Sequence, residues 1–127
     1  MSDDTSVRRV RPAERVPGQP TAGMRREEAV ATDRLWAGYV TTDAGSVSGW
    51  HHHGDYETSI YVVAGTLRME SGPGGAEVME AVAGDFVHVP PHAIHREGNP
   101  SEETSALVVV RSGEGEAVIN VEGPAPD

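Results

Sequence analysis

From residue 35 onward the chain alternates between short apolar runs and clusters of turn-forming residues. Seven runs have the character of strands: LWAGYVTT, TSIYVV, TLRMES, AEVMEAV, DFVHVP, SALVVVRS and AVINV. Segments rich in Gly, Pro, Asp and Ser separate them, such as DAGS, SGPGG and SGEG, and these residues favour turns. The runs are too short and too rich in β-branched residues to be buried helices. Seven or more strands in one small domain predict an all-β sandwich or a barrel that closes on itself.

The first 27 residues lack this pattern. They are polar, contain Pro and Gly, and carry clustered arginines at Arg8, Arg9 and Arg11. We expect residues 1–27 to form an N-terminal arm that is disordered over residues 1–15; the alternative is an arm that becomes ordered against a partner subunit. Only residues 25–32 have a locally helical composition. The barrel domain is expected to span residues 28–127.

Composition and charge narrow the class of protein. The 127 residues suffice for one domain, and without cysteine any metal must be held by nitrogen and oxygen. The net charge of −10, with arginine as the only strongly basic residue, argues against nucleic acid or membrane surfaces as partners. No apolar run approaches the roughly 20 residues of a membrane helix. Because the first residues also lack the apolar stretch of a secretory signal, we expect a cytoplasmic protein.

Two segments, residues 45–65 and 84–99, carry the side chains best suited to chemistry. The first holds His51, His53 and Glu57, and the second holds further histidines. Imidazoles combined with a carboxylate suit a divalent transition metal such as Fe, Zn, Ni or Mn. Alternate side chains of a strand share a face, so His51 and His53 point into the same space and His52 points away. We therefore do not expect His52 to be a ligand; a solvated, histidine-rich turn is the alternative.

Ligand chemistry and strand alternation disagree about Glu57. If Ile60 and Val62 face the core, strict alternation places Thr58 inward and Glu57 outward. A β-bulge after the preceding turn would bring Glu57 back to the inner face. Because threonine is a poor metal ligand, we expect Glu57 to be the carboxylate ligand. On chemistry alone, His88, His92 and His95 all remain candidates for the third imidazole.

The first segment resembles the first motif of the cupin superfamily, G-x5-H-x-H-x3/4-E-x6-G. The matching residues are Gly45, His51, His53, Glu57 and Gly65, except that seven residues instead of six separate the last two. The second segment is similar to the second motif, G-x5-P-x-G-x2-H-x3-N. Its matching residues are Gly84, Pro90, His95 and Asn99, with His92 in place of the family's glycine.

The chain thus looks like a small single-domain cupin of the cupin 2 type. This resemblance implies a double-stranded β-helix, also called a jelly-roll barrel, with one divalent metal inside its mouth. It selects His95 as the third imidazole and so implies a site of His51, His53, Glu57 and His95. It also implies a homodimer, because dimers are common in the superfamily. Cupins perform many different reactions, so the fold does not fix the chemistry.

We expect a metal-dependent enzyme that acts on a small organic molecule. Iron would suit dioxygenase chemistry, whereas Zn, Ni or Mn would suit isomerase, lyase or cyclase chemistry. The alternatives are a non-catalytic binding or sensor cupin and a metal-stabilised structural protein. Without Glu57, three imidazoles alone would resemble the thiol and diketone dioxygenases among the cupins. Arg68 is a candidate to bind a substrate carboxylate, or to pair at the surface with Glu70 or Glu77.

Overall fold

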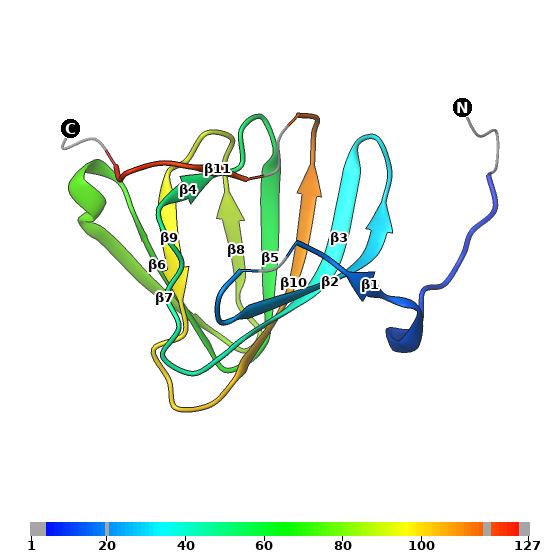
Figure 1. Cartoon of the computed structure of the whole chain (residues 1–127), viewed down its shortest axis with the longest axis horizontal. Helices are drawn as coiled ribbons and strands as arrows, with labels where there is room; N and C mark the ends of the chain where they lie inside the picture. Colours follow the sequence, from blue (N-terminus) through cyan, green and yellow to red (C-terminus); the bar gives the residue numbers. More distant parts are fainter. Residues whose placement is uncertain (1–4, 20, 116–117, 125–127) are drawn as a thin grey trace.

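The computed structural model describes residues 5–19, 21–115 and 118–124. Two antiparallel sheets face each other and enclose the core, as Figure 1 shows. The elements in chain order are η1 (Pro12–Glu14), β1 (Val16–Pro17), β2 (Met24–Ala31), β3 (Leu35–Thr42), β4 (His51–His52), β5 (Glu57–Ala64), β6 (Thr66–Ser71), η2 (Pro73–Gly75), β7 (Glu77–Val82), β8 (Phe86–Val89), β9 (His95–Gly98), β10 (Ser105–Ser112) and β11 (Ile119–Asn120).

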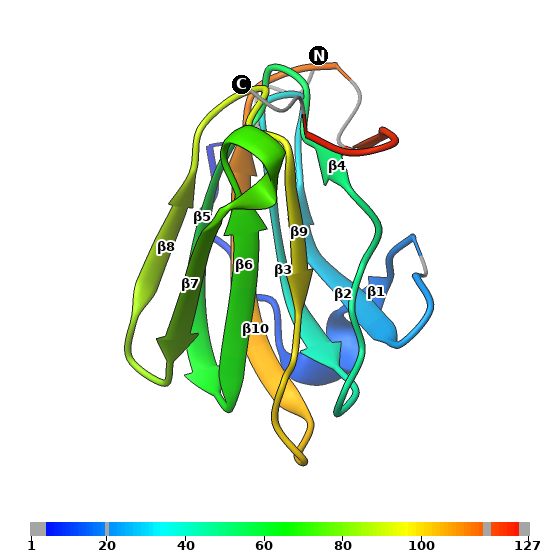
Figure 2. The same cartoon turned by 90° about the vertical axis from the view of Figure 1, so that its left-hand side faces the viewer.

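The strand order is that of a double-stranded β-helix, which confirms the predicted fold class. One sheet has the order β1-β2-β3-β10-β5-β8 and the other the order β11-β4-β9-β6-β7. Strands that are distant in sequence are therefore neighbours: β10 lies between β3 and β5, and β9 lies between β4 and β6. Figure 2 shows β9 between β6 and β4 along one side of the barrel. This interleaving brings the two histidine-bearing segments together.

Apolar side chains on the inner faces of the strands form the core. In the six-stranded sheet, Leu107 of β10 lies between Val40 and Val62, and all three are almost fully buried. Two residues further along β10, Val109 lies beside Ile60 and is also buried. Because alternate residues share a face, the short apolar runs of the sequence bury one side of each strand.

The next inward position along the same strands is polar. Arg111 of β10 lies in register with Trp36 of β3 and Thr58 of β5. Arg111 and Thr58 are both buried. The apolar layers of the barrel therefore end at a polar layer near one mouth, where a chemical site can be built.

Residues 25–32 form most of strand β2 and not the short helix that their composition suggested. Strand β2 pairs with β3 from Met24↔Thr42 to Ala31↔Trp36. Glu and Ala favour helices only by fractions of a kcal/mol, and pairing along a whole neighbouring strand outweighs that preference. The division expected after residue 27 falls inside this strand.

The other predicted runs agree with the strands to within a few residues. LWAGYVTT, TLRMES and SALVVVRS coincide with β3, β6 and β10. AVINV is shortened to β11, and its first residue lies outside the described part of the chain. Residues 1–4 also lie outside it. Residues 5–15 contain one 3-10 turn and extend to one side of the barrel, beyond β1 (Figure 1), so disorder over residues 1–15 stays a prediction. In the described part of the chain, no helix has the length and apolar character needed to cross a membrane.

Gly65 closes the tight turn between β5 and β6. Its φ of +80° lies in the left-handed region that favours glycine. A Cβ atom at this position would also approach the Cβ of Ser105 to 2.9 Å. Both constraints explain why the first motif requires glycine here.

Candidate metal centre

Three buried imidazoles converge inside the barrel. Their ligand-capable nitrogens lie within 4.8 Å of one another, and the residues are His51, His53 and His95. His51 of β4 is directly opposite His95 of β9 in the strand register, with ring centroids 4.3 Å apart. His53 follows β4 by one residue and completes the triangle at 5.1 Å from His51 and 5.0 Å from His95. The alternation predicted for residues 51 and 53 therefore places both on the inner face.

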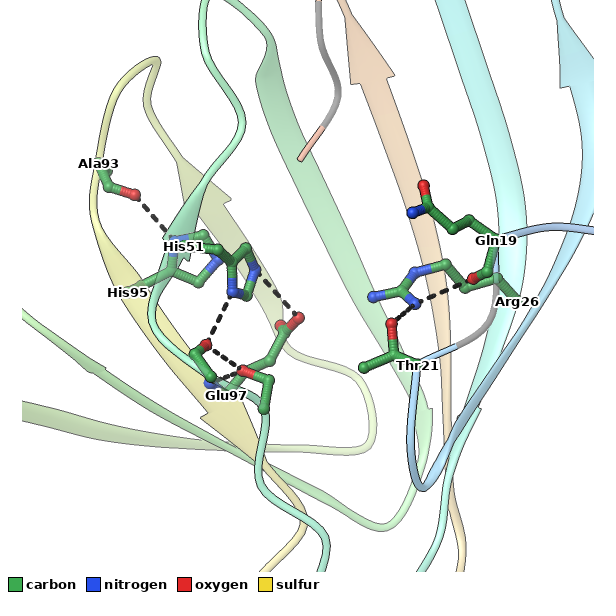
Figure 3. Close-up of polar contacts among 9 residues, drawn as sticks. Gln19, Thr21, Arg26, His51, Ala93, His95 and Glu97 are labelled. Atoms are coloured by element: carbon green, nitrogen blue, oxygen red, sulfur yellow. Dashed lines mark hydrogen bonds and ion pairs between the residues drawn. The ribbon is translucent and has the colours of Figure 1, made fainter. Parts of the chain in front are cut away.

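Backbone carbonyls orient two of these rings. The Nδ1 atom of His51 lies 3.0 Å from the Gly49 carbonyl oxygen, and that of His95 lies 2.9 Å from the Ala93 carbonyl oxygen (Figure 3). A carbonyl only accepts, so Nδ1 carries the proton and Nε2 keeps its lone pair. Among the described residues, the buried Nε2 of His95 has no hydrogen-bond partner. A buried acceptor without a partner beside two more imidazoles fits a metal ion, which would be held by these three side chains.

The electrostatics favour the ligand form of His51. Burial lowers the pKa of His51 from its ordinary value of 6.5, and the neighbouring Glu97 only partly opposes this effect. The imidazole is therefore neutral at pH 7, and a neutral imidazole is the form that binds metals.

Glu57 does not join the three imidazoles, so its expected position is corrected. Its side chain is 57% exposed, and Oε2 lies 2.6 Å from Nε2 of His88 on the outer face. Strict alternation holds along β5, with Thr58 only 1% exposed. Counted from Thr58, four residues lead back to His53 and six lead on to Gly65, which satisfies both spacings of the first motif. Thr58 therefore stands where the motif has glutamate.

A different carboxylate lies at the centre. Glu97 of β9 is buried, and its Oε1 lies 3.8 Å from Nε2 of His51. Burial opposes ionisation of this group, but the neighbouring imidazoles, which are protonated at acid pH, and Arg26 lower its pKa. Sequence reasoning missed Glu97, although it follows His95 by two residues and alternation alone places both on one face.

The remaining histidines lie outside the cluster. His52 is half-buried, and its Nδ1 accepts a hydrogen bond from the Gly54 amide at 3.0 Å. His92 has a φ of +63°, so it adopts the left-handed conformation for which the family motif uses glycine. Its exposed ring lies 2.7 Å from the Asp55 carboxylate. His88 pairs with Glu57, as described above. None of the three reaches the buried imidazoles.

A cavity of about 450 Å³ opens beside the centre. Its charged and aromatic lining consists of Arg26, Glu28, Trp36, Tyr56 and Arg111. Burial lowers the pKa of Arg111, as expected for a cation removed from water. Continuing the alternation from Val109 would have predicted that Arg111 points inward. The helix expected over residues 25–32 gave no such indication for Arg26.

Arg68, which the sequence suggested as a residue that binds a substrate carboxylate, lies at the surface. Its Nη1 atom lies 3.5 Å from Oε2 of Glu80 on the neighbouring strand β7. The expected partners, Glu70 and Glu77, are not used: Glu70 pairs with Arg96 at 2.9 Å. Arg68 therefore belongs to an exposed ion pair and not to the site.

The fold has clear counterparts among solved structures. KdgF from Halomonas sp. matches with a TM-score of 0.71 and 24% identity, covering 84% of this chain and 94% of that chain. A double-stranded β-helix protein from Klebsiella pneumoniae matches with a TM-score of 0.69 and 20% identity, covering 82% and 90%. Oxalate decarboxylase from Bacillus subtilis matches with a TM-score of 0.71 and 20% identity, covering 86% of this chain but only 30% of that chain.

A comparison with curated proteins finds no match. The family model described as "Cupin domain" matches residues 38–111, which include all three buried histidines and Arg111. These residues make up more than half of the chain. The chain therefore belongs to the cupin family.

Proposed function

We propose that this cupin is a metal-dependent enzyme that converts a small organic molecule. The observation that carries the proposal is the triangle of buried imidazoles inside the barrel. Among the described residues, the Nε2 atom of His95 has no hydrogen-bond partner, and a cavity adjoins the centre. Three protein ligands with a vacant position are typical of catalytic metal sites, whereas structural sites are usually closed by four. The replacement of the motif glutamate by Thr58 leaves that position to a small molecule.

A bound divalent metal would supply either dioxygen chemistry or Lewis-acid polarisation, according to its identity. The chain itself supplies the remaining functions. His51, His53 and His95 hold the ion, and the two backbone carbonyls orient the rings of His51 and His95. Glu97 carries an ionised carboxylate within reach of the centre, so its Oε1 atom can accept a proton from a bound molecule. A base of this kind supports an enzyme over a passive binding module.

Metal content is the first test. We expect protein purified without added metal to contain one divalent ion per chain by elemental analysis. The His51→Ala/His95→Ala double variant should lose it, because each ligand bond is a large share of the binding free energy. His52→Ala and His88→Ala are the matched controls and should retain it. Full metal content in the double variant, or loss in His52→Ala, would show that the site is assigned wrongly.

The identity of the ion selects the reaction type. Iron would indicate a dioxygenase, and oxygen uptake with candidate substrates is the assay to use. Zinc, nickel or manganese would indicate an isomerase, lyase or cyclase. Manganese belongs in this set because Mn(II) centres are named for the structurally similar oxalate decarboxylase. A metal-loaded protein that binds small molecules in the cavity but converts none of them would favour the binding or sensor alternative.

A further inference from the structure

We propose that the cavity beside the three histidines binds a small organic carboxylate, whose carboxylate group is held by Arg111 and Arg26. The inference deepens the proposed function by naming the class of substrate. It rests on the proposed function only for the end of the bound carboxylate that would contact the metal.

Arg111 is a buried cation that lines the cavity. The residue is only 6% exposed, yet in the described part of the chain its Nε atom has no hydrogen-bond partner. Its guanidinium stacks on the Trp36 ring at 5.0 Å, which fixes the plane of the group without neutralising its charge. A charged side chain removed from water is strongly unfavourable unless an anion compensates it. The guanidinium lines the cavity, where such an anion would bind.

Arg26 is held in place by neutral groups. Its Nη1 atom donates to Oγ1 of Thr21 at 2.6 Å and to the carbonyl oxygen of Gln19 at 3.3 Å. Figure 3 shows the side chain extending from β2 toward the side of the barrel that carries His51, His95 and Glu97. These contacts position the guanidinium and leave its positive charge in the cavity.

In the part of the chain that the structure describes, other arginines form ion pairs with carboxylates, whereas Arg26 and Arg111 do not. Several other arginines lie within 4 Å of a carboxylate, in the pairs Arg15–Glu27, Arg25–Asp43, Arg68–Glu80 and Arg96–Glu70. Among the described residues, neither Arg26 nor Arg111 makes such a pair. Among the described arginines without such a pair, Arg26 and Arg111 are the two that line the cavity beside the centre.

The charges of the cavity leave room for an anion. Glu28 lines it too, but its carboxylate accepts a hydrogen bond from Nε1 of Trp36 at 2.9 Å. Among the described residues, neither Glu28 nor Glu97 forms an ion pair with Arg26 or Arg111, so an organic anion can still pair with these guanidinium groups. A divalent ion at the histidines would add to the attraction. A planar carboxylate also matches the fork of donors on a guanidinium better than a spherical ion does.

Arg26, Arg111 and one of the three histidines, His53, border the same interior space. A much smaller cavity is lined by both arginines and also by His53, Thr58 and Glu97. A molecule whose carboxylate lies on the guanidinium groups would therefore extend toward the imidazoles. The six-stranded sheet would hold the anionic end, and the five-stranded sheet would present the metal.

The test compares acids with uncharged analogues of the same shape. We would titrate benzoate and succinate, and then benzamide and succinamide, into the protein as purified and into protein stripped with a chelator. Binding would be followed by calorimetry and by tryptophan fluorescence, because Trp36 lies under Arg111. We expect at least one acid to bind in both samples and its amide to bind about tenfold more weakly or worse.

Two substitutions and a matched control locate the site. Arg111→Met and Arg26→Gln should each weaken binding of the acid by about tenfold or more. Arg25→Gln is the control, because Arg25 is the outward neighbour on the same strand and pairs with Asp43. If Arg111→Met does not fold, Arg26→Gln against Arg25→Gln still decides. Equal affinity for acid and amide, or unchanged affinity in Arg26→Gln, would overturn the proposal, as would tighter binding of inorganic phosphate than of every acid.

Metal content, measured in the same samples, separates this inference from the proposed function. Metal binding without acid binding would reject the carboxylate site and leave the metal-dependent function standing. Acid binding that requires both arginines, in a chain that holds no metal, would reject the function and leave the anion site standing.

Discussion

At position 58 the chain carries threonine where the family motif has glutamate, and a carboxylate appears instead at position 97. The two residues lie on different sheets but face the same interior space. Glu97 follows the ligand-bearing His95 on β9, so the strand that supplies an imidazole also supplies the acid. The motif is thus altered at one position while the site keeps a buried negative charge.

Replacing Glu97 tests this exchange. Glu97→Gln should lower metal affinity by about 10–100-fold, because the carboxylate neighbours an imidazole ligand and offsets the charge of the ion. Competition with a chromophoric chelator measures the change. Glu57→Gln is the control of equal chemistry on the outer face, and its affinity should match the unmodified protein. Equal losses in the two variants would contradict the assignment.

The buried His51 predicts how the stability of the metal-free protein depends on pH. Its pKa is lowered by burial in the folded state, so below pH 6.5 the unfolded state binds the proton more readily. The contribution of His51 is fully present above pH 6.5 and is lost as the pH falls toward the lowered value. Urea unfolding between pH 8 and pH 5 should therefore show decreasing free energy of unfolding toward acid.

Two variants assign this slope to one residue. His51→Asn should flatten it between pH 6.5 and pH 5, whereas His88→Asn, on the exposed face, should leave it in place. Protonation of Glu97 itself falls below this range, because its pKa is lowered from 4.5. A slope that persists in His51→Asn would mean that other groups cause it.

Among the elements, the connection between β9 and β10 depends on one side chain. Asn99 is fully buried, and its Nδ2 donates to the carbonyl oxygens of Thr42 at 3.1 Å and Glu103 at 2.6 Å. Its Oδ1 accepts from the amide and the hydroxyl of Ser101 at 3.0 and 2.7 Å. The second motif ends in asparagine because an amide alone both donates twice and accepts here.

Removing this amide should destabilise the whole barrel. Asn99→Ala leaves buried backbone groups without partners, so we expect a loss of about 2–4 kcal/mol in the free energy of unfolding. Ser101→Ala removes only a hydroxyl at the edge of the same network and should cost about 1 kcal/mol. Chemical denaturation compares the two. Similar small losses would show that water replaces the amide.

For the whole molecule, one end of the outer face of β5 and β8 is apolar, whereas the other end carries the Glu57–His88 pair. Phe86 of β8 is 74% exposed and packs against Tyr61 of β5, with ring centroids 4.9 Å apart. Val63, two residues after Tyr61 on β5, is also exposed. Exposed apolar patches of this kind mark association surfaces. We propose that the chain forms a homodimer through this face. The net charge of −10 opposes association only weakly at physiological salt, where charges are screened beyond about 8 Å.

A charge placed in this face should separate the subunits. We expect Phe86→Glu to sediment as a monomer at concentrations where the unmodified protein is a dimer. Val47→Glu is the control, because Val47 is 60% exposed and lies away from β5 and β8. Dimers that survive Phe86→Glu, or an unmodified protein that is already monomeric, would reject the interface.

Much of the fold and part of the site followed from the sequence alone. Short alternating runs separated by turn residues determine β-strands, since only a period of two buries one face of such runs. The same period placed His51 and His53 inward and His52 outward. It also placed Thr58 inward, and the expectation for Glu57 was wrong where ligand chemistry was preferred to alternation.

Tertiary structure alone decided the rest. Local composition favoured a helix over residues 25–32, and only pairing with β3 turned this segment into a strand that points Arg26 inward. Pairings between distant strands brought His95 against His51 and placed Arg111 above the apolar core. No local pattern encodes these contacts, because they depend on which strands become neighbours. The chemistry of the cavity therefore arises from the order of strands in the two sheets, which determines which charges meet inside the barrel.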